Sequence, residues 1–530
     1  MNNSPSLSPT SIVAECSGDT LTLHQEGSVW TSGDVRVELA PHFYGNDSSF
    51  SVRISSPTAP LLCVRLVWAE PQNPDSRFLG DAWERTYGDA GWRSLADSGD
   101  MPWYYLENSP GGHTTGWGVL TQPNAFASWR VRPEGRTLTL DLRAGGQPVR
   151  LGARTLEAVT VLRYEGAPGA SAWQTGRYFC RALCPNPRFA KEPVYGYNDW
   201  YCAYGHNTAE NFLADAAAIV ACAEGCVHRP YVVVDDGWEP NSATPEGGYG
   251  PWDSSADSFG MSMPDLAAKI VELGAKPGLW YRPLHAWDDT PEGQRLLDDP
   301  RHIDPSVPET EARIREEVAR FRDWGFRLVK IDYLTADMNG TVWGMSLGER
   351  VIPSDAIRWR RDDRTSAEVV KALYTAMREA AGDDVVIIGC NAINHLAAGL
   401  FEVQRIGDDT SGREWERTRK MGVNTLAFRS IQDRAFFAPD ADCVGLVEEG
   451  DVPWEKNRQW LDLVARSATP LFVSWKRRLL TPQVQDALRE AFRLASDPRP
   501  TGEPLDWFDT PTPTRWHFCH FGGETKTYEW

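Results

Sequence analysis

A lysine and an aspartate lie two residues apart in an otherwise apolar run of this sequence. Residues 326–333 read Phe-Arg-Leu-Val-Lys-Ile-Asp-Tyr, with Lys330 and Asp332 near the end of the run. A run of this kind is typical of a parallel strand that is buried on both faces. Because residues i and i+2 of a strand point to the same face, Lys330 and Asp332 point together. They form either a buried structural ion pair or part of a site, and the ends of the other apolar runs decide between the two.

Several other apolar runs also end in polar or aromatic side chains. These side chains are Asp199, Trp200 and Tyr201, Asp235 and Asp236, Trp280, Cys390, Arg405, and Asp408 and Asp409. Paired carboxylates perform acid, base and nucleophilic chemistry on glycosidic bonds, and flat aromatic rings stack on the C–H faces of sugars. A metal-dependent barrel enzyme would also gather acids, but none of the ten histidines lies at these ends. We therefore favour sugar chemistry over metal chemistry, and we expect no metal or other cofactor.

The pattern of elements after residue 185 positions these side chains. Apolar runs that we expect to be strands span residues 194–200, 231–234, 277–281, 326–333, 385–390, 403–406, 442–444 and 470–475. Amphipathic helices lie between them: Thr208 and Ser366 are expected to cap two of these helices, and a third is expected to begin at Pro264 and to end at Gly274. About eight β–α units predict an α/β fold, a (β/α)8 TIM barrel whose C-terminal strand ends form the active site. The alternative is a doubly wound sheet, but no Gly-rich phosphate turn follows any of these runs.

The flanking segments have different patterns. Residues 1–185 alternate short apolar runs with turn clusters at a period of two, which predicts an N-terminal antiparallel β-sandwich. Residues 481–530 predict a short C-terminal helix and β-hairpin, which leaves residues 186–480 for the catalytic barrel. Residues 81–89 interrupt the sandwich with aromatic and charged side chains. We expect this segment to have a packing role, with reach over a neighbouring site as the alternative.

Composition and charge narrow the classes of function. The 530-residue chain has a formal net charge of −19, which disfavours a nucleic-acid partner, and its 23 Trp fit either sugar binding or a large core. No apolar stretch of about 20 residues occurs, and no basic N-terminal segment precedes an apolar run, so we expect neither a membrane span nor a signal peptide. The ten cysteines, including Cys222 and Cys226 on a predicted helix, are expected to be reduced thiols of a cytoplasmic protein. A homo-oligomer stays open.

Six short segments resemble motifs of the α-galactosidases of glycoside hydrolase family 36, in clan D. Residues 329–333 resemble the nucleophile strand, and residues 405–410, Arg-Ile-Gly-Asp-Asp-Thr, resemble the acid/base segment Arg-Ile-Gly-Pro-Asp-Thr. The other segments are residues 234–238, 277–280, 389–390 and 433–443. The resemblance covers about residues 190–450 in the family's order, and an N-terminal sandwich also fits the family.

The resemblance implies a role for each matching position. Asp332 resembles the nucleophile, and Asp409 matches the acid/base. The positions that would bind or enclose the sugar are Asp235, Asp236, Trp200, Tyr201, Trp280, Lys330, Cys390 and Arg405. The family also brings a Trp from its sandwich to the site, here Trp83 or Trp92. The implied activity is that of a retaining exo-glycosidase that removes terminal α-galactosyl residues by double displacement.

Alternatives to this activity stay open. The same site could act on α-N-acetylgalactosaminides or β-L-arabinopyranosides. The chain could also be a catalytically silent sugar-binding protein, although both candidate catalytic carboxylates are present, or a metal-dependent barrel enzyme. In all but the last case the partner is a carbohydrate, such as a galactoside.

The sequence departs from the family pattern in the acid/base segment. Asp408 replaces the family's proline, so two adjacent carboxylates compete for one role. Neighbours at a strand end point in opposite directions, so we expect Asp409 to face the sugar and Asp408 to point away. Asn391 stands where the family often has Gly. The loop 335–364 is long for a barrel and contains Trp343 and Trp359, which predicts a lid or an aglycone subsite, with a packing insertion or an oligomer contact as the alternative.

Overall fold

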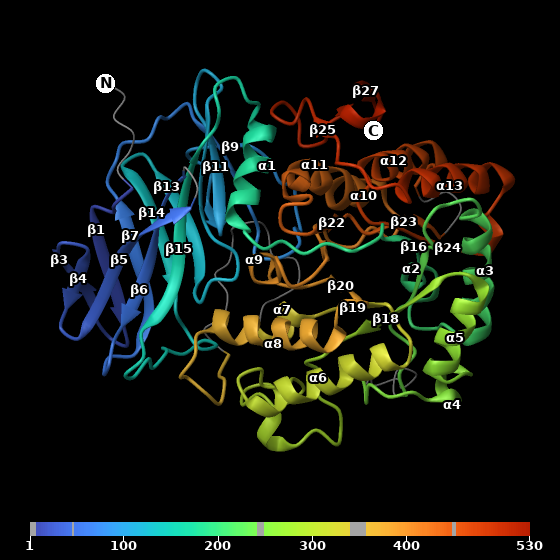
Figure 1. Cartoon of the computed structure of the whole chain (residues 1–530), viewed down its shortest axis with the longest axis horizontal. Helices are drawn as coiled ribbons and strands as arrows, with labels where there is room; N and C mark the ends of the chain where they lie inside the picture. The colour runs from blue at the N-terminus through green and yellow to red at the C-terminus, as the bar shows by residue number, and fades with distance from the viewer. Residues whose placement is uncertain (1–6, 45–46, 241–248, 340–356, 448–451) are drawn as a thin grey trace.

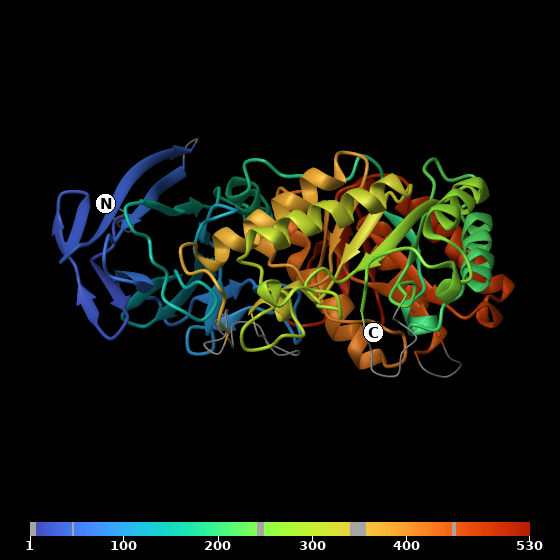
Figure 2. The same cartoon turned by 90° about the horizontal axis from the view of Figure 1, so that it is seen from below.

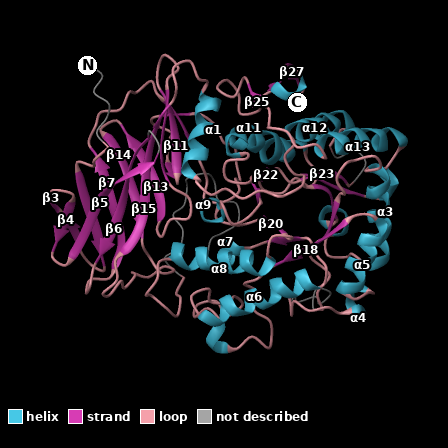
Figure 3. Cartoon of the chain, in the orientation of Figure 1, coloured by secondary structure: helices cyan, strands magenta, loops and turns pink. Residues whose placement is uncertain are grey.

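The computed structural model describes residues 7–44, 47–240, 249–339, 357–447 and 452–530. It has an all-β part at the N-terminal end and a larger part in which helices surround a parallel sheet (Figure 1). The two parts lie side by side along the long axis of the molecule (Figure 2). Colouring by secondary structure separates them clearly (Figure 3). The predicted combination of an antiparallel sandwich with a TIM-type barrel is confirmed.

The sandwich consists of two antiparallel sheets. The first sheet has the order β10-β13-β14-β7-β1-β2 and consists of β1 (Ser11–Cys16), β2 (Thr20–Thr22), β7 (Leu61–Trp68), β10 (Asp100–Pro102), β13 (Phe126–Arg132) and β14 (Gly135–Asp141). The second has the order β3-β4-β5-β6-β15-β12-β11-β8-β9 and consists of β3 (His24–Glu26), β4 (Val29–Ser32), β5 (Val35–Tyr44), β6 (Asp47–Ser55), β8 (Arg77–Gly80), β9 (Arg93–Ser94), β11 (Tyr104–Asn108), β12 (Thr114–Val119) and β15 (Leu156–Glu165). Buried and half-buried residues alternate along β1, as a strand with one covered face requires. Trp68, Trp117 and Trp129 meet in the core with ring centroids 5.7–5.8 Å apart.

The barrel sheet is parallel throughout and has the order β22-β21-β20-β19-β18-β17-β16-β24-β23. Its strands are β16 (Tyr195–Asn198), β17 (Tyr231–Val234), β18 (Lys276–Tyr281), β19 (Leu328–Ile331), β20 (Val386–Gly389), β21 (Val403–Arg405), β22 (Ala438–Asp440), β23 (Cys443–Leu446) and β24 (Leu471–Trp475). Only Ala441 and Asp442 separate β22 from β23, and Asp442 has a left-handed φ of 67°. β22 pairs with β21, and β23 pairs with β24. The two short strands therefore act as one bent strand that closes the ring. The sequence predicted a single short strand at residues 442–444, because a bend of this kind has no local signature.

The helices lie on the sandwich, around the barrel sheet and at its strand ends. They are α1 (Ala172–Leu183), which packs on the sandwich strands β12 and β15, then α2 (Trp200–Ala203), α3 (Ala209–Cys222), α4 (Ala256–Phe259), α5 (Met263–Leu273), α6 (Pro308–Asp323), α7 (Leu334–Asn339), α8 (Ser366–Ala381), α9 (Asn394–Ala397), α10 (Trp415–Thr418), α11 (Thr425–Arg429), α12 (Trp454–Ser467) and α13 (Pro482–Ala495). Thr208 caps α3, and Gly274 ends α5 at φ 98°, as predicted. The cap of α8 is Thr365 rather than Ser366, because Thr365 and Glu368 form a reciprocal capping box.

The C-terminal segment forms a small three-stranded antiparallel sheet. Its strands are β25 (Glu503–Pro504), β26 (Arg515–Phe518) and β27 (Glu524–Thr527), and β26 and β27 form the predicted hairpin. All ten cysteines are free thiols. Cys226 lies beyond the end of α3, so it does not share a helix with Cys222, contrary to prediction. In the part of the chain that the structure describes, no helix combines the length and apolar character needed to cross a membrane.

Candidate active site

The C-terminal ends of the barrel strands enclose a pocket of about 270 Å³. Its walls consist of Arg85, Trp200, Asp235, Asp236, Trp280, Lys330, Asp332, Tyr333, Cys390, Asp408, Asp409 and Arg417. All the predicted site residues except Tyr201 and Arg405 are among them. A larger groove of about 920 Å³ lies between α12, α13 and β27, and none of the predicted site residues lines it.

Asp332 is held by two N–H groups. The Trp280 indole donates to Oδ2 over 3.0 Å, and the backbone N–H of Tyr333 donates to Oδ1 over 2.8 Å. Tyr333 has a left-handed φ of 63°, a conformation that is uncommon for a residue other than glycine. Lys330 and Asp332 both line the pocket, and the ion pair of Lys330 is with a residue of another strand end. Its Nζ lies 2.7 Å from Oδ2 of Asp235, two strands away, so the lysine ties β19 to β17 across the pocket floor.

Asp235 and Asp236 differ in their surroundings. Asp235 is buried and accepts hydrogen bonds from Asn198, at 2.6 Å, and from Lys330. Asp236 forms a side-chain hydrogen bond with Glu239, which is completely buried. Two carboxyl groups can share such a bond only when one of them holds a proton. Burial, together with the charge of Glu239, raises the pKa of Asp236 to about 9, so the two groups share one proton at neutral pH.

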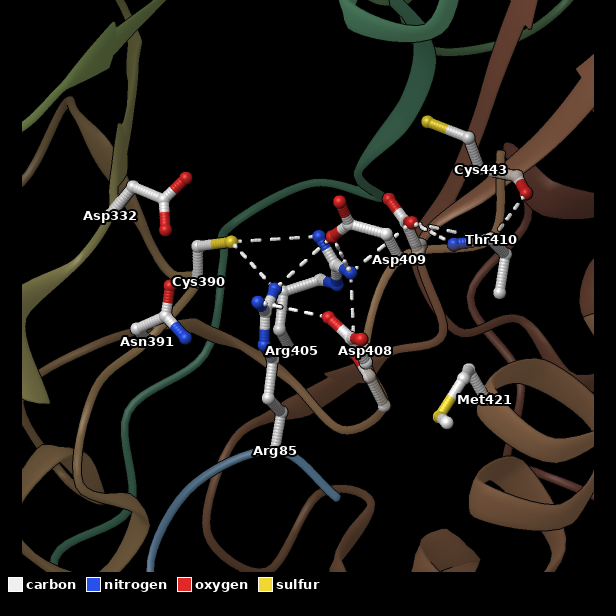
Figure 4. Close-up of polar contacts among 12 residues, drawn as sticks. Arg85, Asp332, Cys390, Asn391, Arg405, Asp408, Asp409, Thr410, Met421 and Cys443 are labelled. Atoms are coloured by element: carbon white, nitrogen blue, oxygen red, sulfur yellow. Dashed lines mark hydrogen bonds and ion pairs between the residues drawn. The ribbon is translucent and has the colours of Figure 1, made fainter. Parts of the chain in front are cut away.

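Asp409 lies between two guanidinium groups (Figure 4). Nη1 of Arg85 and Nη2 of Arg405 are each 3.2 Å from its Oδ1. Burial alone would raise the pKa of Asp409, but the charges of Arg85, Arg405 and Lys330 outweigh burial and hold the pKa well below its usual range. Asp332 lies on one side of Cys390 and Asp409 on the other. The pocket therefore presents carboxylates on two walls.

Asp408 does not point away from the pocket, contrary to prediction. It lines the pocket beside Asp409. Nη2 of Arg85 is 3.0 Å from its Oδ1, and Nη2 of Arg417 is 2.5 Å from its Oδ2. The rule that neighbours at a strand end alternate fails here because β21 ends at Arg405, so residues 408 and 409 lie in a loop.

Arg405 and Tyr201 lie behind the pocket wall instead of in it. Arg405 is 1% exposed and forms an ion pair with Asp442 at 3.1 Å. The Tyr201 hydroxyl donates to the same carboxylate. Nη1 of Arg405 also lies 3.5 Å from the Cys390 sulfur. These contacts make Arg405 a support for Asp409 and Cys390, both of which line the pocket.

The sandwich contributes an arginine to the site, and neither predicted Trp lines the pocket. Trp83 packs edge-on against Trp103 at 5.0 Å, and Trp92 stacks on Phe508 at 4.6 Å. Arg85 lines the pocket instead. Residues 81–89 thus follow the alternative interpretation, in which this segment reaches a neighbouring site.

The loop after β19 is described only in part. Trp359 is buried, and its indole donates to the Met338 carbonyl, so Trp359 has a packing role. Trp343 lies outside the described residues. Among the described residues, no group of three or more His, Cys, Asp or Glu side chains is arranged to hold a metal ion.

Sequence reasoning missed Arg85, Tyr333 and Arg417 as pocket residues. Arg85 stood in a segment that was already conspicuous for its charges and rings, but nothing local connects it to residues more than 300 positions later. Tyr333 directly follows the predicted nucleophile, which is a usable signal. Arg417 belongs to α10, a single turn that periodicity does not reveal.

No family model matches this chain. Solved structures share its fold. The α-galactosidase TtGalA from Thermus thermophilus, in complex with p-nitrophenyl α-D-galactopyranoside, aligns over 98% of this chain and 99% of its own, with a TM-score of 0.59 and 16% identity. The galactosidase domain of the α-galactosidase–sucrose kinase AgaSK aligns over 88% and 67%, with a TM-score of 0.61 and 14% identity. The family 36 α-galactosidase AgaB from Geobacillus stearothermophilus aligns over 92% of this chain and 75% of its own, with a TM-score of 0.59 and 13% identity. The sandwich-and-barrel fold is thus the one that glycoside hydrolase family 36 α-galactosidases adopt.

Proposed function

We propose that the protein is a retaining exo-glycosidase of the α-galactosidase type that hydrolyses terminal α-galactosyl residues. The observation that carries the proposal is the joint presence of Asp332 and Asp409 in one pocket at the mouth of a barrel. Solved structures with this fold are α-galactosidases, and one of them holds a nitrophenyl galactoside. The ten free thiols support the predicted cytoplasmic location.

The proposed reaction has two displacements at the anomeric carbon. Asp332 attacks that carbon, the bond to the glycosidic oxygen breaks with its electron pair passing to that oxygen, and a covalent galactosyl-enzyme forms with inverted configuration. An alcohol takes its proton from Asp409 when that carboxyl is protonated, and an acidic leaving group departs as its anion. The two N–H donors on Asp332 orient the carboxylate for this attack. Asp409, as a carboxylate, then removes a proton from water, and the water releases galactose with the original configuration.

The pocket walls support binding of a single terminal sugar. Its volume of about 270 Å³ is smaller than that of usual drug-sized sites, which suits one monosaccharide ring. Trp200 and Trp280 supply flat apolar surfaces for the C–H groups of the ring. Asp235, paired with Lys330, offers an acceptor and a donor side by side for adjacent hydroxyls. An endo-acting enzyme would need an open groove instead.

A screen of nitrophenyl glycosides tests the proposal. We expect the α-galactoside to be cleaved in preference to the α-N-acetylgalactosaminide and the β-L-arabinopyranoside, with no loss of activity in EDTA. Proton NMR in the first minutes should show α-galactose as the first product, since two inversions restore the configuration. Asp332→Asn is the matched inactive control. Release of β-galactose first, or equal turnover by Asp332→Asn, would contradict the mechanism, and binding without turnover would indicate a silent sugar-binding protein.

A further inference from the structure

We propose that Arg85 is a positioning residue, supplied by the sandwich, that keeps Asp409 in its carboxylate form. The pocket is thereby suited to α-galactosides with acidic leaving groups, such as phenols, rather than to those with alcohol leaving groups. The inference deepens the proposed function and rests on it for the nature of the substrate.

The backbone on either side of Arg85 is fixed to the barrel. Thr86 pairs with the acid/base segment as an added strand would: its N–H donates to the Ile406 carbonyl, and its carbonyl accepts from the N–H of Asp408, both over 2.9 Å. The Glu84 carbonyl accepts from the Arg429 guanidinium over 2.6 Å. These anchors hold the residues before and after Arg85, so its guanidinium is aimed at Asp409 before any substrate binds.

The charges around Asp409 balance only while it is ionised. Three guanidinium groups, of Arg85, Arg405 and Arg417, form ion pairs with three carboxylates, of Asp408, Asp409 and Asp442. Other ionisable groups also face Asp409 or its partners, and they are Lys330, Asp332, Cys390, Tyr201, Glu84, Tyr87, Asp440 and Cys443. Protonation of Asp409 would leave the buried guanidinium groups of Arg85 and Arg405 with one counter-charge fewer, which is unfavourable.

An ionised Asp409 performs only half of the double displacement well. It is a competent base for the water that attacks the galactosyl-enzyme, but it has no proton to give to the departing oxygen. An alcohol needs that proton as the glycosidic bond breaks, whereas a nitrophenolate leaves without it. The geometry therefore slows the first displacement when the leaving group is an alcohol. Neither displacement is slowed when the leaving group is acidic.

The test compares kcat/KM against pH for methyl and p-nitrophenyl α-galactoside in the wild type and in Arg85→Met. For the methyl galactoside, kcat/KM of the wild type should fall as the pH rises above a low pKa, because only protonated Asp409 can donate to the departing alcohol. We call this falling part of the pH profile the methyl galactoside limb. In Arg85→Met this limb should lie at least about one pH unit higher. At a pH above the limb, kcat/KM relative to its low-pH value should then be about tenfold higher than in the wild type. The nitrophenyl galactoside should not show the same shift. Arg85→Lys should restore the wild-type limb, because it keeps the charge.

Arg429→Met is the matched structural control. Arg429 is a buried arginine that binds the same segment through the Glu84 carbonyl and the Asp81 carboxylate, and it also donates to the Ile406 carbonyl. Its replacement should lower thermal stability without moving the methyl galactoside limb. If Arg429→Met moves the limb as far as Arg85→Met, the effect is one of folding, and the positioning role is wrong. An unmoved limb in Arg85→Met overturns it as well.

A direct titration separates this inference from the proposed function. In protein labelled with ¹³C at aspartate carboxyl groups, the Asp409 resonance, assigned with Asp409→Asn, should titrate at least about one pH unit higher in Arg85→Met than in the wild type. If this shift occurs but no galactoside is turned over, the positioning role of Arg85 holds and the proposed galactosidase activity is wrong. If the galactosides are turned over but the resonance does not shift, the proposed activity holds and the positioning role is wrong.

Discussion

The hydrogen-bonded carboxyl pair of Asp236 and Glu239 makes a prediction about stability. We consider Glu239→Gln, which keeps the shape of the side chain and replaces its carboxyl group by an amide. The introduced amide donates to the Asp236 carboxylate, so the pair no longer needs a shared proton. In the wild type the pair holds that proton because Glu239 is completely buried and Asp236 lines the pocket directly beside it.

The expected magnitude follows from one proton. In the unfolded chain both carboxyls have ordinary pKa values, 3.8 and 4.5, and are ionised above about pH 6. In the folded wild type the pKa of Asp236 is raised to about 9, so the native state binds about one proton more than the unfolded state between these limits. A raised folded pKa means that stability is lost as pH rises. Relative to the variant, the wild type should lose stability as the pH rises from about 6 to about 8, by no more than the roughly 1 kcal/mol per pH unit that one bound proton contributes.

Urea unfolding at several pH values measures this difference. Other buried carboxyls, such as Asp199, also titrate in the window, but they are common to both proteins and cancel in the comparison. Asp236→Asn should give the same pH-dependent difference, and the double variant should add nothing further. A difference in the free energy of unfolding that does not change with pH would mean that the pair shares no proton, and the reasoning would fail.

Four further predictions concern the candidate catalytic carboxylates, their neighbour Asp408 and the requirement for a metal. Asp332→Gly should lose nearly all activity on nitrophenyl α-galactoside and regain part of it in azide, with β-galactosyl azide as the product identified by NMR; near-normal activity without azide would remove its assignment as nucleophile. Asp409→Ala should accumulate the galactosyl-enzyme and be accelerated by azide to the opposite anomer, α-galactosyl azide, whereas the β anomer would reverse the assignment. Asp408→Ala should show no azide rescue but should shift the methyl galactoside limb downward, because Arg85 then pairs with Asp409 alone; a limb at the wild-type position would contradict this coupling. Dialysis against EDTA should leave kcat unchanged, and a loss that zinc or magnesium reverses would support the metal-dependent alternative.

The fold was largely predictable because its signals are local. Apolar runs located eight of the nine barrel strands to within a few residues and missed β22, and Thr208 and Gly274 marked helix ends that the structure confirms. Since the C-terminal ends of parallel strands must meet at one edge, the same runs also indicated which side chains come together. Most of the predicted site residues do line one pocket. Their catalytic and binding roles remain predictions.

The missing parts of the site depend on contacts between distant segments. Arg85 reaches Asp409 across 324 positions of sequence, and no periodicity in either segment reports the other. Lys330 was assigned to Asp332 by strand alternation, but ion pairs follow distance and not register, and Asp235 lies closer in space. The ionisation of Asp236 likewise depends on Glu239, whose complete burial is a property of the folded chain.

The residue at position 408 connects the departure from the family motif to the role of Arg85. A proline there, as the resemblance would predict, has no N–H and could not donate to the Thr86 carbonyl, so it would remove one of the two backbone bonds that fix the segment around Arg85. It would also remove the carboxylate to which Nη2 of Arg85 binds at 3.0 Å. The aspartate thus supplies both the backbone donor to Thr86 and the side-chain acceptor for Arg85. The aspartate at 408 is therefore better understood as the counterpart of the sandwich arginine than as a second candidate acid, and the two residues belong to a single arrangement that sets the charge of Asp409.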